Sequence, residues 1–333
     1  MTAAATAPAE SVRSANRPQS RWLGFTLRRG GRLLASLWVL ITASFLMIHL
    51  IPGDPIRAAM GPTASAEIVE SRREALGLND PLLLQYWNYL QGLFTGDLGT
   101  SIGSQLPVID TIAQRLPATA SLAVLAFLVA ILIAIPLGVA VAVATRRDRG
   151  RNLELGFTGS SVLMSSIPDF LLGVAGVWIF GVTLGWLPVA GRSGPESYIM
   201  PVLALSIGPA AVLARIVRVE MLGVLESDFV RTARAKRLPA WRIYLNHALP
   251  NAVTASLTLR GLLLSALVAG TVLVENVFAW PGLGSTIVQA IQTKDYPLVQ
   301  GIVLVYGLGV LIINTVVDAI LVTLDPRTTV AED

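Results

Sequence analysis

Polar side chains inside otherwise apolar runs are the first candidates for chemistry in this 333-residue chain. Asp169 and Arg260 each interrupt such a run, and Asn314 and Asp318 lie one helical turn apart in another. A charge at the centre of a membrane-spanning helix costs about 3 kcal/mol on insertion scales, so it usually faces a cavity or a partner. Asp169 is predicted to line a pathway between helices or, alternatively, to pair with Arg260 or with a neighbouring subunit for assembly. Asn314 and Asp318 are predicted to bond between helices, with a place on the pathway as the alternative.

Three acidic residues lie in the connections between the apolar runs. Asp54, in Ile-Pro-Gly-Asp-Pro, is predicted to be a turn residue whose carboxylate caps the chain. Asp97 occurs in a second glycine-rich segment, Gly-Asp-Leu-Gly. Glu275 follows the fifth apolar run and is predicted to hydrogen-bond to the glycine-rich turn at 282–284. A role for these residues in docking a partner or in gating is the alternative.

Several kinds of chemistry are excluded by what the sequence lacks. The chain has no cysteine and only two histidines, His49 and His247, so no metal site is expected and both histidines are assigned to interfaces. It has no phosphate-binding G-x-x-x-x-G-K-[ST] motif and no histidine–carboxylate or serine–histidine cluster. The chain is therefore predicted not to be an enzyme. It is predicted to hold no cofactor itself.

Composition places these residues in a membrane protein. Hydrophobic residues make up 53% of the chain and charged residues 14%, against about 25% charged residues in soluble domains. Six segments reach the roughly 20 apolar residues that cross a bilayer as a helix. The fold class predicted is an all-α integral membrane protein with six transmembrane helices, at about 33–51, 119–144, 157–187, 197–214, 252–274 and 298–324.

The distribution of basic residues predicts the orientation of these helices. Of the 25 Lys and Arg residues, 18 lie in the two tails and in the loops at 145–156 and 215–250. Cytoplasmic loops carry an excess of positive charge, so both termini are predicted to be cytoplasmic. The basic residues lie between apolar runs and not along a groove, which argues against nucleic-acid binding.

The connection at 52–116 is too long for a turn and carries helix signals. Asn79-Asp80-Pro81 predicts an N-cap followed by proline at the first helical position. Apolar residues then recur at helical spacing, and a second short pattern leads into the second apolar run. We predict a small helical cap on the outer face, or alternatively helices that lie on the membrane surface.

The connection at 223–250 predicts a helical hairpin. Ser227 or Asp228 can cap a first helix that ends near Lys236, and Pro239 can begin a second helix that Pro250 would end. An apolar stripe is predicted on one face of the second helix, formed by Trp241, Tyr244, Leu245, Ala248 and Leu249. A basic, amphipathic hairpin can lie on anionic lipid or insert into a groove of a partner protein, and the spacing alone leaves both open.

This connection resembles the coupling motif of ABC importer permeases, written EAA-x3-G-x9-I-x-L-P. Aligned on Leu249 and Pro250, Ala233 also matches, whereas Arg237 replaces the glycine. The turn is then predicted to use ordinary dihedral angles or Leu238-Pro239. The resemblance assigns coupling to an ATPase to Asp228, Arg231, Thr232, Ala233, Arg237, Trp241, Tyr244, His247, Leu249 and Pro250.

Other segments extend the resemblance from about residue 25 to 327. They are His-Leu-Ile-Pro-Gly-Asp-Pro at 49–55, Gly-Asp-Leu-Gly-Thr-Ser at 96–101, Glu-Asn-Val-Phe-Ala-Trp-Pro-Gly-Leu-Gly at 275–284 and Asp-Tyr-Pro-Leu-Val-Gln-Gly at 295–301. Together they look like the B-type permease subunit of dipeptide, oligopeptide and nickel importers.

The resemblance implies a multi-pass protein of the bacterial cell membrane that works in a complex. A second, C-type permease subunit would supply the other half of the path, ATP-binding subunits would hold ATP and magnesium and clasp the hairpin, and an extracytoplasmic binding protein would deliver peptides. Membrane lipid surrounds the chain, and no nucleic acid is involved. The alternatives are a secondary transporter, or the same class of importer carrying a nickel chelate or haem.

These expectations divide the chain into five parts. They are a disordered cytoplasmic tail at 1–20, an N-terminal segment with the first transmembrane helix at 21–51, an extracytoplasmic helical segment at 52–116, a permease core at 117–327 that includes the coupling loop at 223–250, and a cytoplasmic tail at 328–333.

Overall fold

The computed structural model describes residues 18–50, 56–57, 61, 64–75, 77–148, 150–255 and 257–324. All regular elements within these residues are helices, and one isolated bridge joins Thr100 to Pro107. The all-α class predicted from the sequence is confirmed for this part of the chain. The predicted tail at 328–333 and the site residue Asp54 lie outside the described residues. Of the predicted tail at 1–20, only residues 18–20 are described.

Four helices are long and apolar enough to cross a membrane. They are α1 (Pro18–Leu50), α5 (Val108–Thr145), α8 (Ile199–Leu225) and α14 (Tyr296–Leu324). The predicted fifth span corresponds to α11 (Leu249–Ala255) and α12 (Leu257–Val277), of which Ala266–Val277 is the apolar stretch found in the described residues. Within the described residues, length and composition thus support four spans, or five with the bent pair described next, so the number of six stays a prediction.

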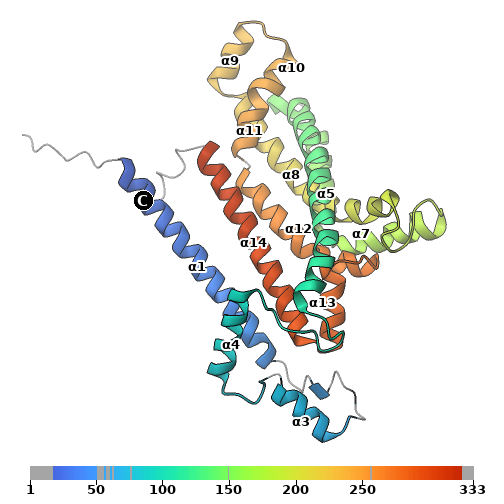
Figure 1. Cartoon of the computed structure of the whole chain (residues 1–333). Helices are drawn as coiled ribbons and strands as arrows, with labels where there is room; N and C mark the ends of the chain where they lie inside the picture. Colours follow the sequence, from blue (N-terminus) through green and yellow to red (C-terminus); the bar gives the residue numbers. More distant parts are fainter. Residues whose placement is uncertain are drawn as a thin grey trace, which may run out of the picture.

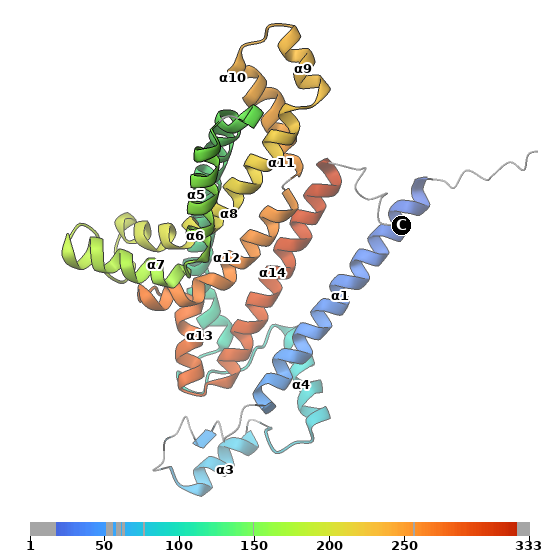
Figure 2. The same cartoon turned by 180° about the vertical axis from the view of Figure 1, so that it is seen from behind.

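The third predicted span is not a straight helix. It consists of α6 (Arg151–Ser166), α7 (Asp169–Gly176) and the π-helix η2 (Val177–Thr183), and the two halves meet at 90°. Ile167 at the break is extended, with φ −80° and ψ 123°, as expected for a residue that precedes proline. The continuous helix predicted at 157–187 is therefore wrong, and α7 projects sideways from the bundle (Figures 1 and 2).

Helix α5 runs through the middle of the bundle and packs along α8. Small residues recur every fourth position on its packed face, and such spacing lets two helices approach closely in a membrane. A Cβ atom added at Gly138 would lie 2.7 Å from the carbonyl oxygen of Ala214. The repeat consists of Ala126, Ala130, Ala134, Gly138 and Ala142.

The two ends of the bundle carry different substructures (Figure 1). At one end, here called the hairpin end, lie α9 (Asp228–Ala235), α10 (Ala240–Arg242) and the π-helix η4 (Ile243–Ala248). At the other end, the outer end, lie α3 (Ala66–Ala75), α4 (Leu82–Thr95) and α13 (Leu283–Gln292). The positive-inside prediction would place the hairpin end in the cytoplasm.

The segment at 52–116 forms helices α3 and α4 as predicted, but α4 begins differently from the prediction. Pro81 is the N-cap of α4 and not its first helical residue, and Asn79 donates a hydrogen bond to Glu70 instead of capping the helix. Helix α4 packs on α1 through its aromatic residues, with the rings of Phe45 and Tyr86 5.0 Å apart. Its other face, with Leu83 and Phe94, is exposed.

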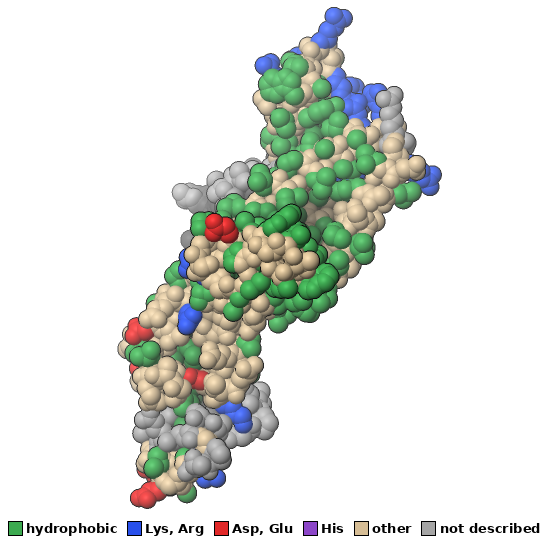
Figure 3. All heavy atoms as spheres, turned by 90° about the vertical axis from the view of Figure 1, so that its right-hand side faces the viewer, with side chains coloured by type: hydrophobic (Ala, Val, Ile, Leu, Met, Phe, Trp, Pro, Cys, Tyr) green, Lys and Arg blue, Asp and Glu red, His purple; other side chains and the backbone are tan. Residues whose placement is uncertain are grey.

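The molecular surface follows the same division. Hydrophobic side chains dominate the middle of the face in Figure 3, and Lys and Arg side chains gather at the end that carries the hairpin. This arrangement matches a chain whose middle lies in hydrocarbon and whose hairpin end lies in water near anionic headgroups.

Candidate functional site

The hairpin is attached to the bundle by an apolar cluster. Val230 and Ala233 of α9 and Ile243 and Ala248 of η4 pack against Met221 and Leu225 at the end of α8 and Ala142 near the end of α5. All seven side chains are buried. Because both arms of the hairpin contribute to one cluster, the hairpin is held firmly against α5 and α8.

The first arm of the hairpin begins where the sequence predicts. Ser227 is the N-cap of α9, but its hydroxyl donates to the carbonyl oxygen of Val224 at 2.6 Å and not to the start of α9. Asp228 and Arg231 form an ion pair at 3.3 Å, and both are largely exposed. Ala233 is buried, and Thr232 donates its hydroxyl to the carbonyl oxygen of Asp228 at 3.0 Å.

The second arm divides the predicted apolar stripe between a buried and an exposed side. Trp241 and Leu245 are 57% and 51% exposed, whereas Ile243 and Ala248 are buried. The cause is the π-helical geometry of η4, because its i→i+5 bonds change the angular spacing on which the predicted stripe was based. The exposed Trp241 and Leu245 therefore form an apolar surface that faces away from the bundle.

The sequence predicts that Pro250 ends the second arm, but the structure places Pro250 inside a helix. It lies in the first turn of α11, where a proline costs no intrahelical hydrogen bond. The π-helix η4 ends at Ala248, and α11 begins at Leu249 without a break. The hairpin therefore continues as helix into the next apolar segment, with Leu249 as the residue of transition and the neighbouring His247 half-buried.

Arg237 forms the turn of the hairpin in an unusual backbone conformation. Its φ angle is +55°, in the left-handed region that favours glycine. The prediction that ordinary dihedral angles or Leu238-Pro239 would make this turn is wrong. The backbone keeps the geometry that a glycine would adopt, and the arginine side chain is exposed there.

Basic residues of the hairpin lie beside those at the end of α5. The guanidinium of Arg234 donates to the carbonyl oxygen of Leu225 at 3.1 Å and so caps the end of α8. Burial and the nearby charges of Arg146 and Arg147 lower the pKa of Arg234 from its ordinary value, and Tyr244 opposes that shift. The exposed arginines here form a positive surface at the hairpin end.

Glu275, at the outer end, makes the contacts that the sequence predicted. Its carboxylate is fully buried and accepts hydrogen bonds from the Thr119 hydroxyl at 2.7 Å and from the backbone N–H groups of Gly284 at 2.7 Å and Ser285 at 3.1 Å. It therefore caps the N-terminus of α13. Because the side chain is enclosed, any part it has in docking or gating is indirect.

Gly282 and Gly284 leave the space that the Glu275 carboxylate and the backbone of α12 occupy, and a larger residue at either position would collide with them. A Cβ atom added at Gly282 would lie 2.3 Å from the Oε2 atom of Glu275, and one added at Gly284 would lie 2.6 Å from the Cα atom of Val272. Trp280 is buried in the same turn and donates its indole N–H to the carbonyl oxygen of Ala118 at 3.1 Å.

Asp295 is a second buried carboxylate at the outer end, and sequence reasoning missed it. It accepts hydrogen bonds from the Ser101 hydroxyl and from the backbone N–H groups of Ile102 at 3.0 Å and Gly103 at 3.1 Å. It thereby fixes the loop after α4 to the turn between α13 and α14. Asp97 makes only a local contact, accepting from the N–H of Gly99 at 2.8 Å.

Asp169 lies between three helices. It begins α7, and its carboxylate oxygens face two glycines, since Cβ atoms added at Gly208 of α8 and Gly270 of α12 would lie 3.3 and 3.5 Å from them. The side chain is half-buried. The side chains of Arg260 and Asp318 lie outside the described residues, so the predicted pairing of Asp169 with Arg260 stays a prediction. Asn314 is half-buried on α14.

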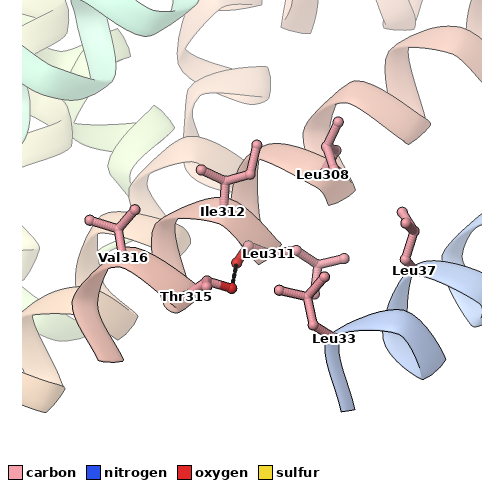
Figure 4. A pocket seen from close by; sticks show the side chains of 7 residues that line it. All are labelled: Leu33, Leu37, Leu308, Leu311, Ile312, Thr315 and Val316. Atoms are coloured by element: carbon pink, nitrogen blue, oxygen red, sulfur yellow. Dashed lines mark hydrogen bonds between the residues drawn. The ribbon is translucent and has the colours of Figure 1, made fainter. Parts of the chain in front are cut away.

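A cleft between α1 and α14 has a volume of about 140 Å³ (Figure 4). Its one polar lining residue, Thr315, donates its hydroxyl to the carbonyl oxygen of Leu311 in its own helix at 2.7 Å. A lining of this kind suits hydrocarbon and offers nothing to a polar substrate. The other lining residues are Leu33, Leu37, Leu308, Leu311, Ile312 and Val316.

Comparisons with known proteins agree with the membrane architecture. The family described as binding-protein-dependent transport system inner membrane component matches residues 134–330, and the family of its N-terminal region matches residues 22–123. The chain is 37% identical to the glutathione transport system permease protein of Escherichia coli K12 and 39% identical to that of Salmonella typhimurium LT2. Each match extends over 304 residues, which is 91% of this chain and 98% of the relative.

Among solved structures, the fold is similar to that of the inward-facing MetNI methionine ABC transporter. The TM-score is 0.53 at 21% identity, and the match covers 65% of this chain and 97% of that one. At this identity the likeness shows a shared fold.

Proposed function

The chain belongs to the family of binding-protein-dependent transport system inner membrane components, and from this premise we propose that it forms one half of the transmembrane path for peptides. It is a permease subunit of an ABC importer and a multi-pass protein of the bacterial plasma membrane. Members of this family are transport subunits, so the chain is not an enzyme.

One observation supports the coupling part of this proposal above all others. The hairpin is fixed to α5 and α8 by buried apolar residues, while Trp241 and Leu245 are exposed on its far side. A firmly attached element with a free apolar and basic surface can transmit a push from a partner into the membrane helices. We assign this surface to an ATP-binding subunit, which supplies ATP and magnesium and hydrolyses the nucleotide.

The substrate class follows from the named relatives. They are glutathione permeases, and glutathione is a tripeptide, so a peptide is the proposed cargo. An extracytoplasmic binding protein would deliver it at the outer end, where the exposed face of α4 with Leu83 and Phe94 offers a docking surface. A second, C-type permease subunit would complete the path.

Asp169 is the proposed polar group along the path. It lies where α7, α8 and α12 meet, and the facing glycines leave space around its carboxylate. Arg260 of α12 and Asn314 and Asp318 of α14 are the further polar residues proposed for the path or for contacts between helices.

Thiol crosslinking tests the coupling role directly, because the chain has no cysteine and each introduced cysteine is unique. In the complex assembled with its partner subunits, Trp241→Cys is expected to crosslink to an ATP-binding subunit. Trp186→Cys is the matched control, since Trp186 is 70% exposed but follows the projecting segment η2. Crosslinks from Trp241→Cys to lipid alone would refute the coupling role.

Transport in sealed vesicles separates the importer from the alternatives. Uptake of labelled glutathione or dipeptides is expected to require ATP and to survive collapse of the ion gradients. Uptake that follows an ion gradient without ATP would indicate a secondary transporter. Uptake of a nickel chelate or haem in place of peptides would refute the proposed cargo and leave the importer class intact.

A further inference from the structure

Arg218 of α8 is a buried cation that no part of the proposed function has used. Its Nη2 atom lies 2.8 Å from the Oε1 atom of Glu154 in α6. Its Nε and Nη2 atoms also donate to the hydroxyl oxygen of Thr145, the last residue of α5, at 3.3 and 3.2 Å. One guanidinium group therefore joins three helices at the hairpin end.

The geometry of these contacts leaves the guanidinium little freedom. The Thr145 hydroxyl donates its own hydrogen to the carbonyl oxygen of Val141 at 2.8 Å, so its lone pairs face Arg218. Glu154 lies in the first turn of α6, where the helix dipole favours a carboxylate. A buried charge is tolerated only when it is paired and hydrogen-bonded, and the planar fork of arginine satisfies both partners at once.

The hairpin is connected to this three-way contact through the end of α8. Beyond Arg218, α8 continues to Leu225, and α9 begins at Asp228. Arg234 of α9 donates to the carbonyl oxygen of Leu225 at 3.1 Å. Leu225 in turn belongs to the apolar cluster that holds both arms of the hairpin. A displacement of the hairpin therefore reaches α8 first, and Arg218 links α8 to α6 by an ion pair, beside the apolar packing of Phe157 of α6 in one cluster with Val217 of α8.

We propose that Arg218 is a positioning residue for energy coupling. It locks the ends of α5, α6 and α8 into one body, so that movement of the hairpin is passed to α6, and from there to α7 with Asp169, instead of being absorbed by bending of α8. This proposal rests on the proposed coupling role of the hairpin. It requires Arg218 itself to touch neither substrate nor nucleotide.

Spin-label distances test the rigid body without knowledge of the substrate. In the cysteine-free chain, labels at Asn246→Cys in the hairpin and Leu155→Cys in α6 are both exposed. In the complete complex, the distance distribution between them is expected to be narrow and the same without nucleotide and with ATP and vanadate. Arg218→Gln is expected to broaden it or to make it depend on nucleotide.

The coupling ratio provides the functional measurement. With labelled glutathione as the probe, Arg218→Gln is expected to lower transport per ATP about tenfold, within the range of measured site-to-site coupling, while basal ATP hydrolysis persists. Arg215→Gln is the matched control, because Arg215 lies one turn earlier on α8 and forms no ion pair within the described residues. It is expected to keep the normal ratio.

Reversal of the pair separates positioning from general stability. Arg218→Glu combined with Glu154→Arg is expected to restore a large part of the coupling ratio that either single change removes. If Arg218→Gln does not assemble, Thr145→Val and Glu154→Gln serve in its place, since each removes one partner and leaves the arginine. Unchanged distances and an unchanged ratio in these variants would overturn the role of Arg218.

The two sets of experiments distinguish a failure of the Arg218 proposal from a failure of the coupling role of the hairpin. If Trp241→Cys crosslinks to the ATP-binding subunit and the Arg218 variants remain coupled, only the positioning role is overturned. If Trp241→Cys never meets an ATP-binding subunit, the coupling role of the hairpin is refuted, and the proposal for Arg218 is overturned with it.

Discussion

Replacement of Glu275 is expected to release α13 from the outer end. The carboxylate accepts three hydrogen bonds, from the Thr119 hydroxyl and from the N–H groups of Gly284 and Ser285. A hydrogen bond to a charged group contributes about 1.5–3 kcal/mol, roughly twice a neutral one. Glu275→Gln keeps the shape and one acceptor oxygen but replaces the other oxygen with an NH2 donor and loses the charge, so a cost of about 1–3 kcal/mol is expected from these values.

Truncation at the same position is expected to cost more. Glu275→Ala leaves three donors without a partner in a fully buried position, and each unpaired donor costs about 1–3 kcal/mol. The total is then roughly 3–9 kcal/mol before water enters the cavity. Glu275→Ala is therefore expected to prevent stable assembly, and Glu275→Gln is the informative change.

Hydrogen exchange measured by mass spectrometry is the assay that localises this effect. For Glu275→Gln, exchange in the peptides of α13 (Leu283–Gln292) is expected to rise about 5- to 150-fold, the factor that corresponds to 1–3 kcal/mol. Glu196→Gln is the matched control, because Glu196 is exposed in the same outer region and its replacement is expected to leave α13 unchanged. Undiminished protection of α13 in Glu275→Gln would refute the capping argument.

Three further replacements give predictions for a hydrogen-bond acceptor, a backbone conformation and a predicted ion pair. Asp295→Ala is expected to speed amide exchange at Ile102 and Gly103 by about tenfold or more, because it removes the acceptor of their N–H groups; unchanged protection there would contradict the anchor. Arg237→Gly is expected to raise the unfolding temperature of the complex, because a left-handed arginine costs about 1–2 kcal/mol, and a lower temperature would show that the side chain contributes more than the strain. If Asp169 and Arg260 pair, neutralising Asp169 impairs assembly and replacing both partly repairs it, whereas additive defects would refute the pairing.

The long helices were predictable because hydrophobic length alone determines them. The break in the third span was not, although Pro168 marks it. Helices α5 and α8 also contain prolines, at 117, 136 and 209, and continue through them. A proline in a membrane helix is tolerated when neighbouring groups satisfy the freed carbonyl, so its presence alone does not predict a 90° bend.

The hairpin shows which part of a local pattern the sequence determines. The beginning of its first helix at Ser227–Asp228 was predicted from capping chemistry, and α9 begins there. The apolar stripe of the second helix was predicted from a regular helical period, but the π-helix η4 has a different period, and the structure buries Ala248 of that stripe while Trp241 and Leu245 are exposed. The left-handed turn at Arg237 was also missed, because an arginine gives no signal for it.

Glu275 and Asp295 illustrate the difference between local and distant partners. The glycine-rich turn that Glu275 caps lies nine and ten residues further along the chain, and the prediction of that contact was confirmed. The partners of Asp295 lie 192 to 194 residues away. Arg218 and Thr145 are 73 residues apart. No periodicity or motif connects such residues, so these contacts emerge only from the folded chain.

The anchored ends and the bend together indicate where movement can occur. Glu275 and Asp295 fix α13 and the loop after α4 to the bundle, and Arg218 fixes α6 to α5 and α8 at the opposite end. Between these anchors, the 90° junction of α6 and α7 is bridged by Ile167 and Pro168 alone. Pro168 is joined to α7 through its carbonyl oxygen, which accepts from the N–H of Leu171 at 2.9 Å, but Ile167 is extended. The junction therefore lacks the continuous ladder of hydrogen bonds that runs through the helices on either side. A force that enters at the hairpin and leaves α5, α6 and α8 rigid is therefore expected to act on this junction and on the packing of α7 against α8 and α12, and a change there moves Asp169 relative to the glycines it faces.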